Sequence, residues 1–532
     1  MKKLAYIAAL GAMLGLGSCD DLDQYPTVEV SSDKVYASSE SSAGVLAQCY
    51  MSFVTTGNGA KDLSIGGEAL LRSLFNLQEG TTDAIAYTWL SGDKLDYLTY
   101  NNWDANDQWV KYVWYRCYVT ITSCNDFIKN AAGSSDAEMQ NMVYEARFLR
   151  ALSLSYILDL FGKGVIPTED QAIGDANLPE KSGKEIYDYI TSELEEIAPL
   201  MSSTVAYPRA TKGAAYALLS RIYLNSKVYA GVEDYDKCVT AAENCEKEGY
   251  VLESKDDYWK LFGADNHKHA GAGKEIIFAF YVDADYCMTW GATTGIICGF
   301  APNTSVFNDL LGIASGWSSL RANKAFTDLF SESDDIRSTF WVNYAVTYKK
   351  DDDGNYELDE DGNKIIDKEY SWSQLVSIED EPTQGWISTK FNNKLDDGTG
   401  DVRSANPTCS TDEPILRLAE VKLNKAEALY RQGKTGDAKA IFDEIRDRVG
   451  ATTNYTLDDD FILAERGREL AYELVRRTDL VRFNKYGGDV NYNWEFKGGA
   501  ASGKNFEAWR NVFPIPSDEL AANSNLSQNA GY

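Results

Sequence analysis

The feature that most constrains the fold is a pair of amphipathic helical patterns between Pro414 and Arg482. The first pattern ends at Gly433, and the second, which Thr435 can cap, ends at Gly450. At helical spacing each pattern places its apolar residues on one face: Leu416, Ala419, Leu423, Ala426 and Tyr430 in the first, and Ala438, Ile441, Ile445 and Val449 in the second. Such a pair cannot bury its apolar faces alone, so the chain must supply further helices that stack beside it.

This helix pair has alanines at the close-packing positions Ala426 and Ala438, and it resembles one tetratricopeptide unit of about 34 residues. A second pair of the same kind is predicted over 210–224 and 235–247, and further helices over 38–50, 108–130, 139–161 and 184–201. We expect about four such pairs, drawn from both halves of the chain. The predicted fold class is mainly α, with tetratricopeptide-like helix pairs forming a right-handed helical scaffold.

A block of acidic and basic residues follows the helix pair. Glu465, Glu469 and Glu473 are spaced four apart, on one face of a predicted helix, where like charges repel. Four arginines are placed to offset them: Arg466, Arg468, Arg476 and Arg482. One interpretation is an acid cluster for catalysis or metal binding. The other, which we favour because every acid has an arginine within reach, is an ion network that ties this helix to the pair before it and specifies packing.

Motifs spread over most of the chain share a family pattern. They are 414–420, 423–428, 445–448, the block 465–482, 145–151 followed by Phe161-Gly162, the Phe513-Pro514-Ile515-Pro516 segment and the ending 525–532. Together these motifs resemble those of the SusD/RagB family, surface lipoproteins of Bacteroidetes that capture nutrients. Small departures are Leu474, where the family often has glycine, and Arg477-Thr478, where it often has aromatic residues. These departures affect local packing and leave the resemblance intact.

The start of the chain is typical of a bacterial lipoprotein signal. Lys2 and Lys3 are followed by an apolar run over 4–15, which is too short to span a bilayer stably, and Leu16-Gly17-Ser18 then places small residues just before Cys19. We expect residues 1–18 to be a lipoprotein signal peptide and Cys19 to carry the lipid that anchors the protein to the membrane. An ordinary signal peptide with an incidental cysteine is the alternative.

Three acids, Asp20, Asp21 and Asp23, stand directly after the cysteine. They resemble the surface-export signal of Bacteroidetes lipoproteins, which implies a lipid-anchored protein in the outer membrane that faces the cell exterior. Asp20 alone suggests inner-membrane retention in other bacteria, and this is the competing interpretation.

Net charge limits the classes of partner, and cysteine spacing limits the disulfides that can form. A net charge of −30 disfavours nucleic acid and anionic membrane surfaces as partners. Cys117 and Cys124, like Cys238 and Cys245, are seven residues apart on one predicted helix, a separation too large for a disulfide. We interpret the cysteines as buried small apolar residues, with Cys287–Cys298 as the one pair to check. We interpret the two histidines, His267 and His269, as residues of an exposed loop, with a metal site as the alternative.

The regularity of the chain changes in the middle. We divide the SusD-like part, 19–532, into an N-terminal helical part (19–250), an irregular insertion (251–410) and a C-terminal helical part (411–532). The insertion is expected to carry the ligand site on loops and short strands. Within it, 275–281 predicts a buried strand, 323–329 a brief helix, and 344–370 a hairpin with Asp-Gly turns at Gly354 and Gly362.

The acids of 359–363 resemble part of a calcium loop, although Lys368 stands where the closing glutamate would be. We predict no cofactor and no metal ligand, with a structural calcium as the alternative.

Two loop stretches, 82–103 and 283–317, combine aromatic rings with amide and carboxylate side chains. Flat rings can cover the C–H face of a pyranose, and the polar groups can hydrogen-bond its hydroxyls. The family implies glycan sites in corresponding loops, but no fixed motif. The predicted ligand-binding residues are Asp83, Tyr87, Trp89, Tyr97, Asn101, Trp103, Tyr286, Trp290 and Trp317. We assign Trp109 and Trp114, which lie on a predicted helix, to the core.

The leading functional hypothesis is a non-enzymatic lipoprotein that captures oligosaccharides or polysaccharides and delivers them to a SusC-like TonB-dependent transporter. A peptide ligand in the same role is the first alternative. A glycoside hydrolase that uses two carboxylates is less favoured, because no sequence pattern selects a pair. The sequence contains no Gly-x-Ser-x-Gly, His-Glu-x-x-His or phosphate-loop motif. A structural tetratricopeptide adaptor is disfavoured by the export signal and the aromatic insertion.

Overall fold

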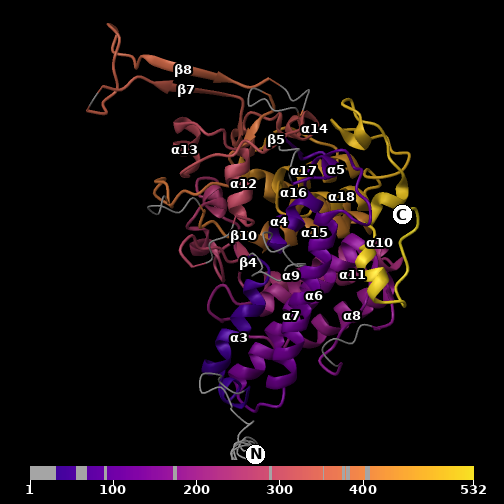
Figure 1. Ribbon diagram of the computed structural model, residues 1–532. Helices are drawn as coiled ribbons and strands as arrows, with labels where there is room; N and C mark the ends of the chain where they lie inside the picture. Colours follow the sequence, from indigo (N-terminus) through magenta and orange to yellow (C-terminus); the bar gives the residue numbers. More distant parts are fainter. Residues whose placement is uncertain are drawn as a thin grey trace, which may run out of the picture.

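The computed structural model describes residues 32–55, 69–88, 93–171, 177–286, 290–351, 353–373, 378, 384–401 and 408–532. Helices dominate both ends of this range (Figure 1). The N-terminal part contains α2 (Ser32–Val35), α3 (Ser39–Met51), α4 (Leu70–Gln78), α5 (Asp96–Thr99), α6 (Gln108–Ala131), α7 (Ala137–Phe161), α8 (Gly183–Ile197), α9 (Lys212–Leu224), α10 (Ser226–Ala230) and α11 (Tyr235–Glu246). The C-terminal part contains α15 (Leu418–Arg431), α16 (Thr435–Val449), α17 (Asp459–Glu469), α18 (Arg476–Arg482) and α19 (Ser517–Ala522).

Between these parts the helices are short, and throughout the described part of the chain each sheet consists of two strands. The helices are α12 (Thr293–Phe300), α13 (Ser305–Leu311) and α14 (Lys324–Thr327). The antiparallel strand pairs are β1 (Ile85–Tyr87) with β5 (Leu320–Ala322), β2 (Lys163–Gly164) with β3 (Lys181–Ser182), β4 (Ile276–Phe280) with β10 (Glu413–Arg417), β6 (Trp341–Val342) with β9 (Ile387–Ser388), and β7 (Tyr344–Tyr348) with β8 (Ile366–Ser371). Short 3-10 turns are η2 (Tyr258–Phe262), η3 (Asn266–His269), η4 (Asp328–Phe330), η5 (Ile336–Phe340), η6 (Lys497–Gly499) and η7 (Ala508–Asn511).

A continuous stack of helices forms the scaffold. Consecutive neighbours in it are α6, α7, α8, α9, α11, α15 and α16, so the two halves of the chain meet where α15 packs on α9 and α11. In the described part of the chain this stack amounts to three pairs and one further helix, α8, against the expected four or so. The alanines that permit close packing, Ala426 and Ala438, are fully buried. The mainly helical fold with tetratricopeptide-like pairs is therefore confirmed.

At the C-terminal helix pair, two details differ from the predictions. Leu416 lies in β10, because the chain is extended before α15 begins at Leu418. Thr435 is the first residue of α16, and Lys434 occupies the cap position without a side-chain cap bond. The stop signals were local and correct: Gly433 and Gly450 both have a positive φ, of 78°. A residue with a Cβ is strained in that conformation, so glycine ends the helix there.

The charged block after the helix pair forms a buried ion network. Arg417 reaches Glu469 at 2.7 Å and Glu473 at 2.6 Å, and Arg337 reaches Glu465 at 2.8 Å. Although burial alone would raise it, Arg337 and other arginines lower the pKa of Glu465 to about 2. The structure thus supports the interpretation as a packing network. Glu473 is not on the helical face with the other two glutamates, because α17 ends at Glu469.

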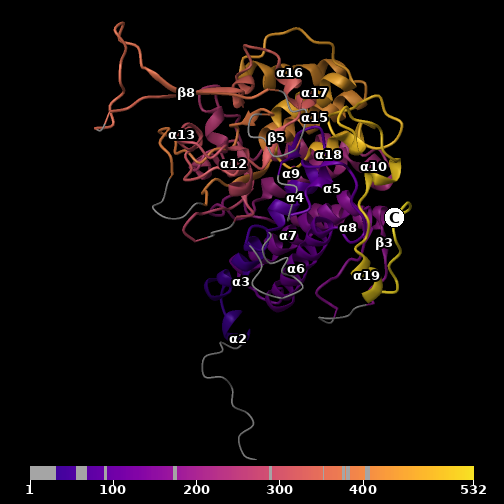
Figure 2. The same cartoon turned by 45° about the horizontal axis from the view of Figure 1, so that its top comes forward.

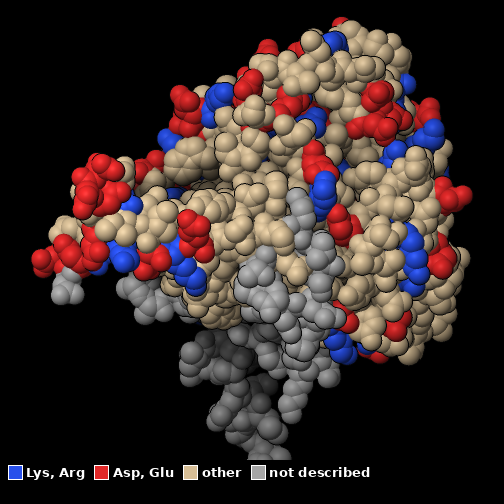
Figure 3. All heavy atoms as spheres, turned by 90° about the horizontal axis from the view of Figure 1, so that it is seen from above, with Lys and Arg blue, Asp and Glu red and all other residues tan. Residues whose placement is uncertain are grey.

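The predicted hairpin projects from the body as an arm made of β7 and β8 (Figures 1 and 2). Gly354 and Gly362, in its two Asp-Gly turns, have φ of +85° and +84°. Acidic side chains gather toward the end of the arm (Figure 3). The Asp359 carboxylate accepts the backbone N–H groups of Asp361 and Asn363, at 3.0 and 2.8 Å, so it caps its own turn. Among the described residues no group of three or more His, Cys, Asp and Glu side chains could hold a metal ion.

Two minor predictions can be compared with the structure. The described cysteines Cys49, Cys117, Cys124, Cys238, Cys245, Cys298 and Cys409 are free and buried, as expected, while Cys287 lies outside the described residues. His269 is not exposed. Its ring is buried between the carboxylates of Glu253 and Asp396, at 2.9 and 3.3 Å.

In the described segments no helix is long and apolar enough to cross a membrane.

Candidate ligand-binding site

The two loop stretches predicted to bind ligand come together at the β1–β5 strand pair. Tyr87 is in register with Leu320, and the Thr88 backbone N–H donates to the Ser319 carbonyl at 3.0 Å. The backbone therefore brings the segment that leads to Trp89 beside Trp317. Trp89 itself lies outside the described residues.

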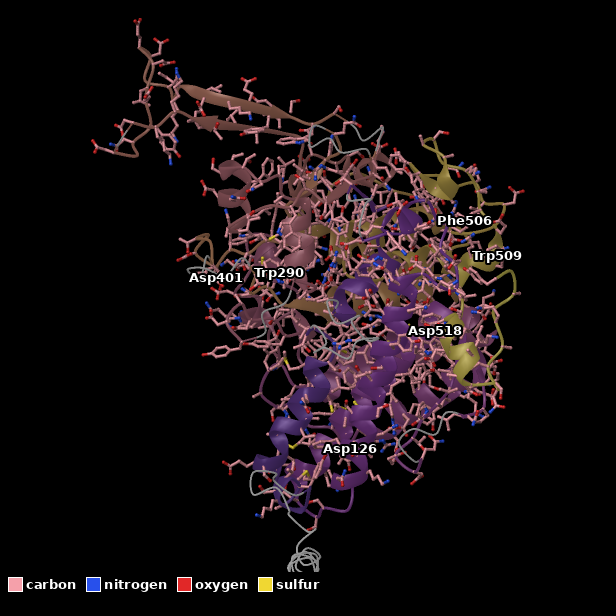
Figure 4. The ribbon with its side chains drawn as sticks, in the orientation of Figure 1. Asp126, Trp290, Asp401, Phe506, Trp509 and Asp518 are labelled. Atoms are coloured by element: carbon pink, nitrogen blue, oxygen red, sulfur yellow. The ribbon has the colours of Figure 1, made fainter. Side chains whose placement is uncertain are left out.

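An exposed pair of indole rings lies at this junction. The ring centroids of Trp290 and Trp317 are 5.7 Å apart, and the rings are tilted by 45°. Trp290 is 50% exposed and Trp317 is half-buried. Figure 4 places Trp290 beside α12, on the flank of the molecule opposite the C-terminal segment. Exposed rings of this size on a soluble protein mark an interaction site more often than single scattered apolar residues do.

Backbone contacts fix the position of the second ring. The Trp317 N–H donates to the Cys298 carbonyl at 2.7 Å, and the Ser318 N–H donates to the Ala301 carbonyl at 2.9 Å. Gly316 packs so closely that a Cβ there would overlap the Ala301 carbonyl oxygen. α12 thus holds the loop rigidly, and little conformational entropy is left to lose when a ligand binds.

Polar groups flank the indole pair. Arg72 lines the same small cavity as Trp317 and forms an ion pair with Asp93 at 2.9 Å. The Arg72 guanidinium also lies 4.9 Å from the centroid of the Trp109 ring, which restrains it. Both charged side chains remain partly exposed, at 20% and 39%. The arrangement offers flat apolar faces beside hydrogen-bond donors and acceptors, which are the groups that a polyhydroxylated ring requires.

Four of the predicted ligand residues are instead buried and have internal partners. Asp83 forms an ion pair with Arg476 at 2.6 Å, and the Tyr87 hydroxyl donates to Asn76. The Asn101 side chain bridges the Thr81 carbonyl and the Gly498 N–H, at 2.9 and 3.0 Å. The Trp103 indole N–H donates to the Tyr532 hydroxyl at 2.7 Å. The C-terminal part of the chain supplies the partners of Asp83, Asn101 and Trp103, whereas Tyr87 is held by Asn76 of α4 and lines the same small cavity as Arg72 and Trp317.

Tyr97 and Tyr286 are exposed, at 44% and 88%, and no described contact joins either ring to the indole pair. Trp109 and Trp114 are buried, as their assignment to the core requires. Arg72 is not among the residues predicted from the sequence, because it lies on α4 and not on a loop. Its one sequence signal is that it is the single charged residue of α4.

Two carboxyls with raised pKa values, Glu79 and Asp412, lie in the protein interior and not at this site. Burial raises the pKa of Glu79 to about 8, and burial raises the pKa of Asp412 to about 7. Both side chains are at most 1% exposed, so neither can touch a ligand.

Comparison with known proteins identifies the family. Residues 274–532 match the family model described as "SusD family", and residues 30–224 match the one described as "Starch-binding associating with outer membrane". The chain is 33% identical over 563 aligned residues to the starch-binding protein SusD of Bacteroides thetaiotaomicron, an alignment that covers 100% of this chain and 99% of that protein. The chain belongs to the SusD family.

Solved structures share the fold of this SusD-family protein. A SusD-like protein from Bacteroides fragilis superimposes with a TM-score of 0.69 at 21% identity, covering 95% of this chain and 100% of that chain. Surface glycan-binding protein A from Bacteroides fluxus gives a TM-score of 0.67 at 20% identity, covering 92% and 98%. At these identities the likeness concerns the fold alone.

Proposed function

We propose that this SusD-family protein captures a glycan at the cell surface and that Trp290 and Trp317 form its platform. The observation that carries the proposal is an exposed, rigidly held indole pair in a chain related over its full length to a starch-binding protein. The family descriptions support glycan binding and association with the outer membrane. Lipid attachment at Cys19 and delivery to a SusC-like TonB-dependent transporter are part of the proposal and follow from the family resemblance.

The geometry suits binding without catalysis. Each indole can cover the C–H face of one sugar ring, while Arg72 and Asp93 hydrogen-bond hydroxyls at the edge of the platform. Because the two indole rings are tilted by 45°, the platform favours a saccharide chain whose successive rings turn relative to one another and disfavours a flat, ribbon-like chain. Because the platform is held by α12 before ligand arrives, most of the interaction energy appears as affinity.

The test is calorimetric titration of protein produced without residues 1–19 against neutral and charged glycans, with peptides alongside. Replacing Trp290 with alanine removes a central aromatic contact, and we expect a loss of about 2 kcal/mol, or about thirtyfold in affinity. Tyr344→Ala is the matched control, because that ring has similar exposure, 53%, but lies on the hairpin arm.

Three results would contradict the proposal. Equal affinity of the Trp290→Ala variant and the unaltered protein would remove the indole pair from the site. Binding of peptides without any glycan would support the alternative ligand class. Release of reducing sugar from any bound glycan would show an enzyme.

A further inference from the structure

A second, polar groove lies on a different flank of the molecule from the indole pair. It has a volume of about 780 Å³, within the range of small-molecule sites. One wall is the segment Tyr100–Asn102, and the other walls come from Phe496, Gly498, Gly499 and residues within 501–510 near the C-terminus. Phe506, which lines the groove, and Trp290 lie on opposite sides of the molecule in Figure 4.

The groove carries a local excess of positive charge in a chain whose net charge is −30. Its lining includes Lys504 and Arg510, with Glu507 as the opposite charge. A third cation, Lys497, lies beneath the lining and is fully buried. The Lys497 ammonium donates to the Tyr492 carbonyl at 2.6 Å and lies 3.5 Å from Asn505 Oδ1, and both of these partners are neutral.

Other charged groups face this region from packed elements. Asp489 accepts a hydrogen bond from the Asn505 amide at 3.3 Å, so it lies at the rim. Asp83 is behind the groove, where it is committed to its ion pair with Arg476 at 2.6 Å. Neither carboxylate forms an ion pair with Lys497, Lys504 or Arg510 among the described contacts.

Arg510 is held in place before any ligand binds. Its guanidinium carbon lies 4.4 Å from the ring centroid of Trp509 and 5.4 Å from that of Trp103, and one N–H donates to the Trp103 carbonyl at 3.1 Å. The nearest carboxylate, Glu507, is 3.6 Å away and mostly exposed, at 62%. A guanidinium presents a planar fork that matches a carboxylate, and this one loses little freedom on binding.

We propose that this groove binds a carboxylate-bearing sugar, so that the protein captures an acidic glycan. Arg510 and Lys504 bind the carboxylate, Asn102 and Asn505 hydrogen-bond the hydroxyls, and Tyr100 offers a ring edge beside them. The inference rests on the proposed function in taking the ligand to be a glycan, but it concerns a site separate from the indole pair.

The experiment compares one oligosaccharide in two charge states. Oligogalacturonate and its fully methyl-esterified form of equal length are titrated calorimetrically into the protein without residues 1–19. We expect the charged form to bind about tenfold more tightly, since a single charge-assisted contact of this kind contributes about 1.5 kcal/mol. The preference should shrink as salt is added, because the groove is open to solvent.

Variants separate the groove from the indole platform. Lys504→Gln should weaken binding of the charged form by about threefold and leave the neutral form unchanged. Lys434→Gln, at another exposed lysine, is the matched control and should change neither. Arg510→Lys keeps the charge but removes the fork, so the charged form should again bind less tightly, and thermal unfolding reports whether the fold is intact.

The outcomes distinguish this inference from the proposed function. Trp290→Ala should leave the difference between charged and neutral forms unchanged. Equal binding of the two forms, no binding of oligogalacturonate, or an unchanged affinity in Lys504→Gln would overturn the acidic-sugar site and leave the indole platform untouched. If Trp290→Ala binds neutral glycans as tightly as the unaltered protein does, and the charge preference is retained, the indole platform is overturned instead.

Discussion

Glu79 is a carboxyl whose burial works against folding at neutral pH. It lies directly after α4, and its side chain is fully buried. Its Oε1 accepts the backbone N–H groups of Val475 and Arg476, at 3.2 and 3.4 Å, while Oε2 has no hydrogen-bond partner among the described residues. Burial raises the pKa of Glu79 to about 8, although Arg476 opposes the change. The Glu79→Gln substitution keeps the Oε1 acceptor and removes the titration.

The pKa sets the size of the effect. In the unfolded chain the carboxyl has its ordinary pKa of 4.5, so at pH 7 it is ionised there and protonated in the folded state. The folded state then binds the extra proton. The contribution of this proton to the free energy of unfolding is fully present below pH 4.5 and is lost as the pH rises to 8. At 1.36 kcal/mol per pKa unit, the loss is about 3 kcal/mol at pH 7 and about 5 kcal/mol above pH 8.

The assay is urea unfolding of both proteins at pH 4.5, 7 and 8.5. We expect Glu79→Gln to raise the free energy of unfolding by about 3 kcal/mol at pH 7, by more at pH 8.5, and by little at pH 4.5. Glu360→Gln, at an exposed glutamate near the end of the hairpin arm, is the control and should show no such pH dependence. A variant that is destabilised equally at all three pH values would refute the reasoning, because it would show that Glu79 is ionised and favourably paired in the fold.

Two further predictions concern the scaffold and the site. Arg417→Met leaves buried glutamates without their cation and should lower the free energy of unfolding by about 3–5 kcal/mol, whereas Lys439→Met, at an exposed ion pair, should change it by less than about 1 kcal/mol in the same denaturation experiment. Gly316→Ala places a Cβ against the Ala301 carbonyl and should displace Trp317. We expect it to cost more free energy in glycan binding than in unfolding. An unchanged affinity in that variant would show that the loop position does not matter for binding.

The sequence predicted the helices well because their signals are local. The apolar spacing and the stop at Gly162 define α7, and Asp136 caps its start through the Met139 N–H at 2.8 Å. The family resemblance, carried by motifs in both halves, was also confirmed. These features need only a few neighbouring residues to specify them.

The site was harder to predict because burial depends on distant segments. Trp103 and Asn101 have the composition of ligand-binding loop residues, yet residues of the last forty positions cover both. Asp83 pairs with Arg476, almost four hundred residues away in the chain. No periodicity in a loop shows which of its rings remain exposed. The contact between Trp290 and Trp317 and the exposure of Trp290 depend on how the chain between them folds around α12.

The indole platform is positioned mainly by backbone groups, and this has a consequence for specificity. Trp317 is fixed through its own N–H and that of Ser318, and the neighbouring strand is joined through Thr88 N–H to Ser319. None of these bonds uses an indole side chain. A change of ring at position 317 therefore alters the aromatic surface of the candidate site while these backbone bonds are kept. Under the proposed function, substitutions at position 317 should therefore change ligand preference while the backbone bonds keep the loop in place.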